Sequence, residues 1–221
     1  MNTEKTPEKP IVKTFPVGPL QCNCTVIGNP ETGEAIVVDP GGDHQKILAV
    51  ISEMGCNPLK IKQILHTHAH FDHFLASGQM KKASNASLCL HRADEPLWNA
   101  LETQCGMYNI PFEPVPPPDH WLSHEEDLPF GGECRHTPGH TPGSASFWFK
   151  ELNLLVAGDT LFKRSIGRTD LWGGDYAAIE KSIKTRLYTL DETATVVTGH
   201  GPSTILGDEM RHNQFVRAGK N

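Results

Sequence analysis

The hydrophobic positions divide the chain into strand-like runs near both ends and helix-like runs between them. Continuous or alternating apolar residues predict strands, whereas apolar residues three and four apart predict helices. The predicted strands are residues 11–15, 24–27, 35–38, 61–65, 87–90, 133–136, 144–149, 152–157 and 195–198. The predicted helices are residues 45–54, 73–82, 92–105 and 175–187, and the proline-rich segment 110–118 predicts a stiff connection. This order predicts an α/β protein with helices on the outside of its sheets.

Length and composition indicate one globular domain over residues 11–221, preceded by a disordered tail over residues 1–10. The tail is polar and lacks the apolar core of a secretory signal, which predicts a cytoplasmic protein with reduced cysteines. Cys22 and Cys24 are therefore interpreted as half-buried strand positions rather than as a redox pair. No apolar run reaches the roughly 18 residues of a membrane span. The formal net charge of −6 argues against a nucleic-acid partner.

Residues 66–73 read His-Thr-His-Ala-His-Phe-Asp-His, which places four histidines and one aspartate in eight positions. His68 and His70 are two apart, so on an extended segment they project to the same side. Asp72 and His73 add an oxygen and a nitrogen shortly afterwards. Neutral imidazole and carboxylate together suit zinc, iron and manganese. The two pairs can therefore face two separate cations.

Three further residues of metal-binding type follow predicted strands. His140 lies in a loop of prolines and glycines, and His200 lies between Gly199 and Gly201. Asp159 ends an apolar run, where a carboxylate is as commonly the N-terminal cap of a helix as a metal ligand. Because each residue lies just beyond a strand end, strands in register would bring all of them to one edge of the sheets.

These motifs resemble those of the metallo-β-lactamase superfamily, and more narrowly those of the short glyoxalase II-like hydrolases of bacteria. The resemblance implies a four-layer αββα sandwich, two mixed β-sheets with helices on the outer faces, without the C-terminal helical extension that binds glutathione in longer relatives. It also implies a site for two divalent metal ions (zinc or iron, with manganese as a third choice). The implied ligands are His68, His70 and His140 for the first metal, Asp72, His73 and His200 for the second, and Asp159 between the two.

The resemblance further implies a chemistry and a substrate. Two cations can share one water as a hydroxide and polarise a carbonyl, while Asp72 orients the hydroxide and accepts its proton as the catalytic residue. The implied substrate is a small-molecule thioester, and S-lactoylglutathione is the leading candidate. The protein is expected to be a monomer or homodimer that does not associate with membranes. Arg168 can hold a substrate carboxylate through its planar guanidinium, or it can pair with Asp170. His66 is interpreted as a support for the ligands.

Two other functions remain open. The sequence from Gly167 to Asp170 also resembles the persulfide dioxygenases, which use one iron held at the positions of His68, His140 and Asp159. Those enzymes usually have alanine where this chain has Phe71, and residues 20–25 look more like the hydrolases. A non-catalytic metal-binding module is the second alternative. Degenerate members of the family are expected to have lost ligands, whereas all seven positions are filled here.

Overall fold

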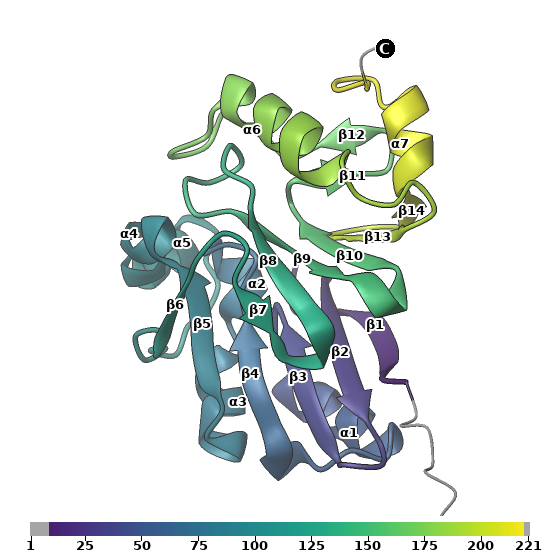
Figure 1. Ribbon diagram of the computed structural model, residues 1–221. Coiled ribbons are helices and arrows are strands. Elements are labelled where there is room, and N and C mark those ends of the chain that lie inside the picture. The colour runs from purple at the N-terminus through teal and green to yellow at the C-terminus, as the bar shows by residue number, and fades with distance from the viewer. Residues whose placement is uncertain (1–8, 219–221) are drawn as a thin grey trace, which may run out of the picture.

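Two six-stranded sheets face each other, and helices cover their outer faces (Figure 1). The computed structural model describes residues 9–218; residues 1–8, most of the predicted tail, and residues 219–221 lie outside that range. The first sheet has the order β1 (Ile11–Val17), β2 (Cys22–Asn29), β3 (Glu34–Val38), β4 (Ile61–Leu65), β5 (Ser87–His91), β6 (His120–Leu122). The second has the order β14 (Thr204–Ile205), β13 (Thr195–Thr198), β10 (Leu154–Gly158), β9 (Ala145–Phe149), β8 (Gly132–His136), β7 (Asp127–Leu128). A small hairpin pairs β11 (Leu161–Phe162) with β12 (Ser165–Ile166).

The helices are short and follow the strands that they cover. The α-helices are α1 (His44–Glu53), α2 (Phe71–Phe74), α3 (Ser77–Ser84), α4 (Glu95–Asn99), α5 (Leu101–Met107), α6 (Tyr176–Ser182) and α7 (Leu206–His212). Single turns of 3-10 helix are η1 (Pro58–Lys60), η2 (Arg92–Asp94), η3 (Pro129–Gly131) and η4 (Lys150–Leu152). A π-helical turn, Ile183–Leu187, continues α6.

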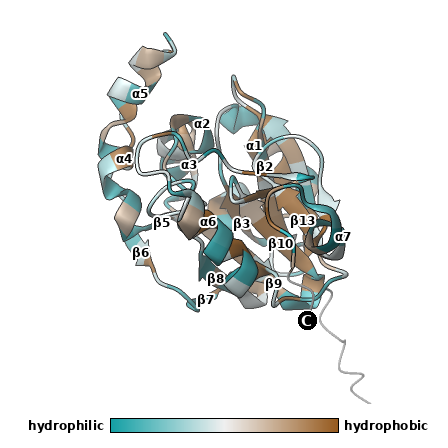
Figure 2. Cartoon of the chain, turned by 90° about the horizontal axis from the view of Figure 1, so that it is seen from above, coloured by the Kyte–Doolittle hydropathy of each residue, from teal (hydrophilic) through white to brown (hydrophobic). Residues whose placement is uncertain are grey.

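Alternation along the strands separates the apolar side chains into layers. In β3, Ala35 and Val37 belong to the core beneath the helices of the first half, whereas Ile36 and Val38 belong to the core between the two sheets. Viewed from above, apolar strands occupy the middle of the molecule, with more polar helices around them (Figure 2). The αββα sandwich predicted from the sequence is confirmed.

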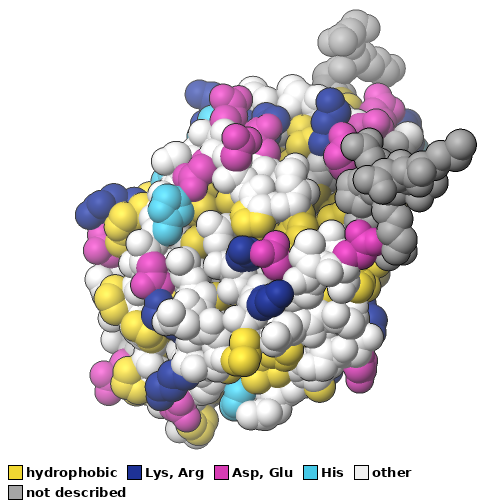
Figure 3. Space-filling view, turned by 60° about the horizontal axis from the view of Figure 1, so that its bottom comes forward, with side chains coloured by type: hydrophobic (Ala, Val, Ile, Leu, Met, Phe, Trp, Pro, Cys, Tyr) yellow, Lys and Arg dark blue, Asp and Glu magenta, His cyan; other side chains and the backbone are white. Residues whose placement is uncertain are grey.

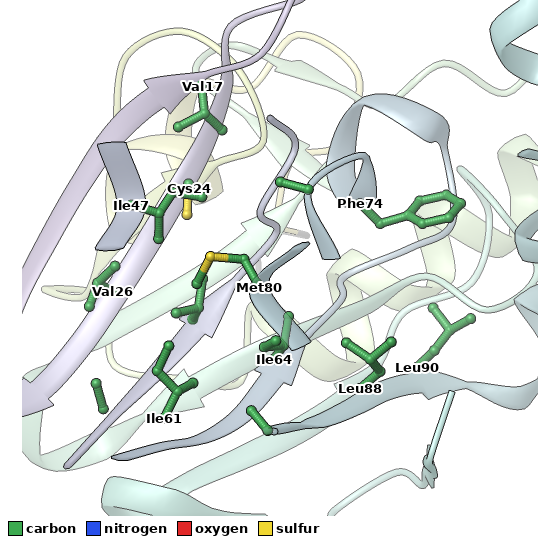
Figure 4. Close-up of a cluster of buried hydrophobic side chains, with 14 of the residues drawn as sticks. Val17, Cys24, Val26, Ile47, Ile61, Ile64, Phe74, Met80, Leu88 and Leu90 are labelled. Carbon is green, nitrogen blue, oxygen red and sulfur yellow. The ribbon is translucent and has the colours of Figure 1, made fainter. Parts of the chain in front are cut away.

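The core under the first sheet is continuous from the strands to the helices. Figure 4 shows Val26 of β2, Ile64 of β4 and Leu88 of β5 on the same side as Ile47 of α1 and Met80 of α3, all fully buried. Phe74 of α2 also lies in this core, and its ring stacks on Trp98 with centroids 4.2 Å apart. This packing fixes α2, which carries two of the predicted ligands, against the sheet.

Parallel strand pairs place several strand ends at the same edge of the sandwich. In the first sheet β3, β4 and β5 run parallel, and in the second β10 and β13 run parallel. The carboxyl ends of parallel neighbours meet at one edge. The segments after β3, β4, β10 and β13 therefore all start there, which is the convergence that the sequence predicts.

The observed elements differ from the predicted ones chiefly in the helices. Strands 61–65 and 195–198 have the predicted bounds. The predicted helix 73–82 is instead α2 and α3, and the predicted helix 92–105 is η2, α4 and α5. In the second case α4 ends and α5 begins at Ala100, and the carbonyl of Leu97 accepts hydrogen bonds from the Ala100 backbone at 3.1 Å and from Gln104 at 2.7 Å.

No helix among residues 9–218 combines the length and apolar character needed to cross a membrane. Figure 3 shows the face that lies at the bottom of Figure 1. Where described residues form this face, Lys and Arg side chains are scattered among Asp and Glu and do not make a basic stripe.

Candidate metal centre

The segment that follows β4 carries four of the predicted ligands. It forms neither helix nor strand from His66 to His70, and His70 is the N-terminal cap of α2. The rings of His68 and His70 lie 4.8 Å apart, as expected for residues that project to the same side. Asp72 and His73 lie on the single turn of α2 and are buried. The two pairs are thus presented one after the other.

The other three predicted ligands come from the second sheet. His140 lies in the loop between β8 and β9, Asp159 directly follows β10, and His200 lies just beyond β13. Asp159 precedes the short strand β11 rather than a helix, so it is not a helix cap. The side chain of Asp159 is instead directed toward the histidines, with Oδ1 3.5 Å from Nε2 of His73 and Oδ2 3.6 Å from Nε2 of His140.

All seven residues belong to overlapping groups whose ligand atoms lie within 4.8 Å of one another. The groups are His68, His70 and His140; Asp72, His73 and His200; and His68, His73 and Asp159. The first two are the sets that the family resemblance implies. Asp159 lies between them, where a shared ligand would have to be.

Three buried atoms at this place have no hydrogen-bond partner among the described residues: Nε2 of His68, Nε2 of His73 and Oδ1 of Asp159. A buried polar atom without a partner costs about 1–3 kcal/mol. Burial also lowers the pKa of His68 well below its usual value and lowers that of His70 to about 3. Both imidazoles are therefore neutral at pH 7, which is the form that binds metals. At the first group, neutral rings and the partnerless Nε2 atom of His68 together fit a cation.

Asp72 contributes a negative charge to the second group. Burial opposes ionisation, but the charge of His73 and the hydrogen bond from His200 outweigh it and lower the pKa of Asp72 to about 2. The bond joins Nε2 of His200 to Oδ2 of Asp72 at 3.1 Å. The carboxylate is therefore ionised throughout the physiological pH range.

Backbone carbonyls orient two of the histidines. Nδ1 of His140 donates to the carbonyl of Arg168 at 2.8 Å, and Nδ1 of His200 donates to that of Leu20 at 3.0 Å. Each bond directs Nε2 toward the centre, as in metal-bound histidines generally; there Nε2 of His200 contacts Asp72 and Nε2 of His140 contacts His70. His70 has the opposite orientation, because its Nδ1 lies 2.9 Å from Nε2 of His140.

Asp39, at the end of β3, orients a third histidine. Its Oδ2 accepts a hydrogen bond from Nδ1 of His73 at 3.0 Å and another from the hydroxyl of Thr67, while Oδ1 accepts from the Thr67 backbone at 2.8 Å. Asp39 is 1% exposed. Asp39 is not among the predicted site residues. It directly follows β3 just as Asp159 directly follows β10, and this position after a strand is the signal that could have identified it.

We expect Asp39→Asn to weaken metal binding at the second group by about 10–100-fold, because the neutral amide holds His73 less firmly and makes it a poorer ligand. Dialysis against a metal buffer, followed by metal analysis, measures the change. Asp43→Asn is the matched control, since Asp43 lies four positions later and is exposed, and the one described hydrogen bond of its carboxylate comes from the Gly18 backbone. Equal metal affinity in both variants would contradict this role for Asp39.

Asp94, in η2, connects the two loops that carry the first group. Its fully buried carboxylate accepts from the backbone of Ala69 at 2.9 Å, the hydroxyl of Thr141 at 2.8 Å and the backbone of Gly143 at 2.6 Å. Ala69 lies between His68 and His70, and Thr141 follows His140. Asp94 therefore fixes the relative positions of these loops. It too is absent from the predicted site, because a lone aspartate before a helix has no distinguishing pattern.

Other histidines and cysteines have structural roles. His66 contacts the carbonyl of Cys89 at 2.9 Å and the hydroxyl of Ser77 at 2.7 Å. It therefore fixes the start of the segment that carries the ligands, but it does not contact a ligand side chain. Cys22 and Cys24 lie on β2 and are not disulfide-bonded, as interpreted from the sequence, but they are fully rather than half buried. The sulfur of Cys22 lies 3.4 Å from Nδ1 of His73, but burial raises the pKa of this thiol to about 12. It therefore stays protonated.

A cavity of about 400 Å³ opens onto the centre. It is lined by Leu20, His70, Phe71, Asp72, Leu97, Gln104, Met107, Tyr108, His140, Asp159, Phe162, Ile166, Arg168, Leu171, Trp172 and His200. Arg168 forms two parallel hydrogen bonds of 2.9 Å to Asp170, and both side chains are exposed. The pairing that the sequence left open is thus present, on a side chain that still borders the cavity.

Comparison with known proteins defines the class to which this fold and site belong. The model of the metallo-β-lactamase superfamily matches residues 17–200, and the chain belongs to that superfamily. It is 34% identical to the hydroxyacylglutathione hydrolase GloC of Haemophilus influenzae, over 94% of this chain and 98% of GloC.

Two solved structures have a similar sequence identity to this chain. The B3 metallo-β-lactamase BLEG-1 is 37% identical, with a TM-score of 0.84 over 93% of this chain and 99% of that one. TTHA1623 in a di-iron-bound form is 36% identical, with a TM-score of 0.84 over 92% of this chain and 100% of that one. Members of the superfamily are usually hydrolases, and the His/Asp groups described above are of the metal-binding type.

Proposed function

We propose that this protein is a metal-dependent thioester hydrolase of the glyoxalase II type, acting on S-lactoylglutathione or related hydroxyacylglutathiones. One observation carries the proposal: Asp159 lies within ligand distance of one histidine from each of two groups of three candidate ligands, and it lines the cavity that opens onto them. In this assignment His68, His70 and His140 would hold one divalent cation. Asp72, His73 and His200 would hold the other, with Asp159 available to either. The similarity to GloC supports the choice of substrate.

The residues around the centre would have different roles in the reaction. Two bound cations, zinc, iron or manganese, would lower the pKa of a shared water and polarise the thioester carbonyl. Asp72 is ionised and is held by His200, so it can orient the attacking water and accept its proton. The departing thiolate needs little protonation, because a thiol has a pKa near ~8.5.

The full ligand set favours hydrolysis over the single-iron dioxygenase. A single iron would use only His68, His140 and Asp159. In the second group, Asp72, His73 and His200, the ligand atoms lie as close together as in the first, and the Nε2 atom of His73 is one of the buried atoms without a partner. A second cation supplies that partner, whereas a one-iron site leaves it unpaired.

A panel of three substrates tests the proposal on the metal-loaded protein: S-lactoylglutathione, a chromogenic cephalosporin and glutathione persulfide with oxygen. The cephalosporin is included because of the similarity to BLEG-1. We expect turnover of the thioester to exceed that of the other two by at least about 100-fold, a difference of about 2.7 kcal/mol in activation free energy. Faster turnover of the cephalosporin or the persulfide would overturn the assignment.

We expect Arg168→Ala to raise KM for S-lactoylglutathione by about threefold to fivefold, since an exposed ion pair with a substrate carboxylate is weak. Asp170→Ala should lower KM, because it removes the carboxylate that now competes for the guanidinium. Truncating Arg168 leaves its backbone bond to His140 intact. Arg211→Ala, on an exposed and paired arginine of α7, is the control. If KM is unchanged in both test variants, Arg168 is only a structural partner of Asp170.

A further inference from the structure

A wall of apolar side chains, buried at its base and exposed at its rim, borders the candidate metal centre. It consists of Phe71 of α2, Leu97 of α4, Met107 and Tyr108 at the end of α5, and Leu171 and Trp172 before α6. Met107 is 78% exposed, Trp172 63% and Tyr108 52%. Figure 2 shows α4 and α5 at the edge of the molecule, beyond the sheets. Large apolar side chains that stay exposed together indicate a binding surface.

The wall is continuous and is fixed to the ligand segments. The ring of Tyr108 lies 5.0 Å from that of Phe71, and Leu97 and Trp172 both line a neighbouring cavity of about 70 Å³. Gln104 of α5 accepts from the backbone of Phe71 at 3.0 Å and donates to the carbonyl of Ala69 at 3.0 Å. Since Phe71 directly follows His70, the wall begins at the first ligand group. A carbonyl held at the centre therefore places one of its substituents against it.

Charge decides which half of a thioester fits this surface. Among the described residues that line the cavity, Arg168 is the only lysine or arginine, and it is already paired with Asp170. The glutathione half carries two carboxylates and an ammonium group, which would lose hydration on an apolar wall without gaining partners. An uncharged hydrocarbon group loses nothing there and gains by burial.

We propose that the wall binds the acyl group, and that the enzyme prefers thioesters whose acyl group is apolar and larger than lactoyl. This inference rests on the proposed thioester hydrolysis. Each added carbon group in an apolar pocket raises kcat/KM by roughly tenfold or more. Because this wall is partly open to solvent, we expect about tenfold for the exchange of a methyl group for a phenyl ring.

S-lactoylglutathione and S-mandeloylglutathione test this directly, because they differ only in a methyl group and a phenyl ring. Each kcat/KM is divided by the rate of hydrolysis by hydroxide alone, which removes the difference in intrinsic reactivity. The metal-loaded wild type is expected to prefer the mandeloyl ester by about tenfold. Trp172→Ala and Met107→Ala should bring the ratio close to one. Both side chains are exposed, so truncation leaves the core unchanged, which circular dichroism checks.

Leu59→Ala is the matched control, since Leu59 is 71% exposed in η1 and does not line the cavity; it should keep the wild-type ratio. A wild-type ratio near one, or a ratio that neither wall variant changes, would overturn the acyl assignment while leaving thioester hydrolysis intact. A ratio near one with both esters slowed equally by Trp172→Ala would assign the wall to the thiol half. Absence of turnover with either ester would overturn the proposed function as well.

Discussion

Asp159→Ala is expected to abolish thioester hydrolysis, with kcat/KM falling by at least about 10³-fold, beyond the ~10–100-fold typical of residues that only support a ligand. Asp159 is the residue placed between the two groups, 3.5 Å from His73 and 3.6 Å from His140. Its loss removes a ligand from both cations and a negative charge from a centre rich in histidine. Metal analysis of the same sample should show that metal content falls with the activity.

The fold should survive this change. Oδ1 of Asp159 has no described hydrogen-bond partner, so truncation leaves no buried donor unpaired. Thermal unfolding of the metal-free proteins should therefore agree within a few degrees between wild type and Asp159→Ala. Asp208→Ala, on an exposed aspartate of α7, is the control for loss of a surface carboxylate. Full activity in metal-depleted Asp159→Ala protein would refute the proposed mechanism.

Asp94→Ala is expected to give the largest loss of stability, about 3 kcal/mol in the free energy of unfolding. Three buried donors, from Ala69, Thr141 and Gly143, would lose their acceptor, at about 1–3 kcal/mol each. Burial of the charge, which raises the pKa of Asp94, offsets part of that loss. Urea unfolding of the metal-free protein measures the difference, free of any contribution from metal binding.

A graded series separates the carboxylate from its donors. Thr141→Val removes one of the three hydrogen bonds to Asp94, together with the contact between the Thr141 and Ser144 hydroxyls, and should cost about 1–2 kcal/mol. In Asp94→Ala the loops of His68 and His140 also lose their connection, so metal content should fall together with stability. An Asp94→Ala protein within ~0.5 kcal/mol of wild type, with normal metal content, would show that Asp94 does not connect the ligand loops.

Sequence periodicity predicts the fold well where burial alone decides it. Residues 61–65 and 195–198 are strands with the predicted bounds, because each is a short run between turn signals. Periodicity does not predict β11, β12 or β14, which have two residues each and exist through their pairing partners. Nor does it predict the breaks in the helices, such as the one at Ala100 between α4 and α5.

The candidate ligands are predictable from the sequence because histidine is uncommon and is here concentrated beyond strand ends. The residues that orient them are not. Asp39 and Asp94 are single aspartates in ordinary turns, and only the fold brings them to Thr67, His73 and Thr141. The wall at Met107 and Trp172 also cannot be predicted from the sequence, because these two residues lie 65 positions apart (172 − 107).

The most direct test follows the loss of thioester absorbance from S-lactoylglutathione under nitrogen, with the metal content counted on the same sample. Turnover without oxygen and about two metals per chain is the predicted result, because hydrolysis at a two-cation centre consumes only water. No turnover under nitrogen, one iron per chain, and oxygen uptake once glutathione persulfide and air are admitted would contradict the account and establish the dioxygenase instead.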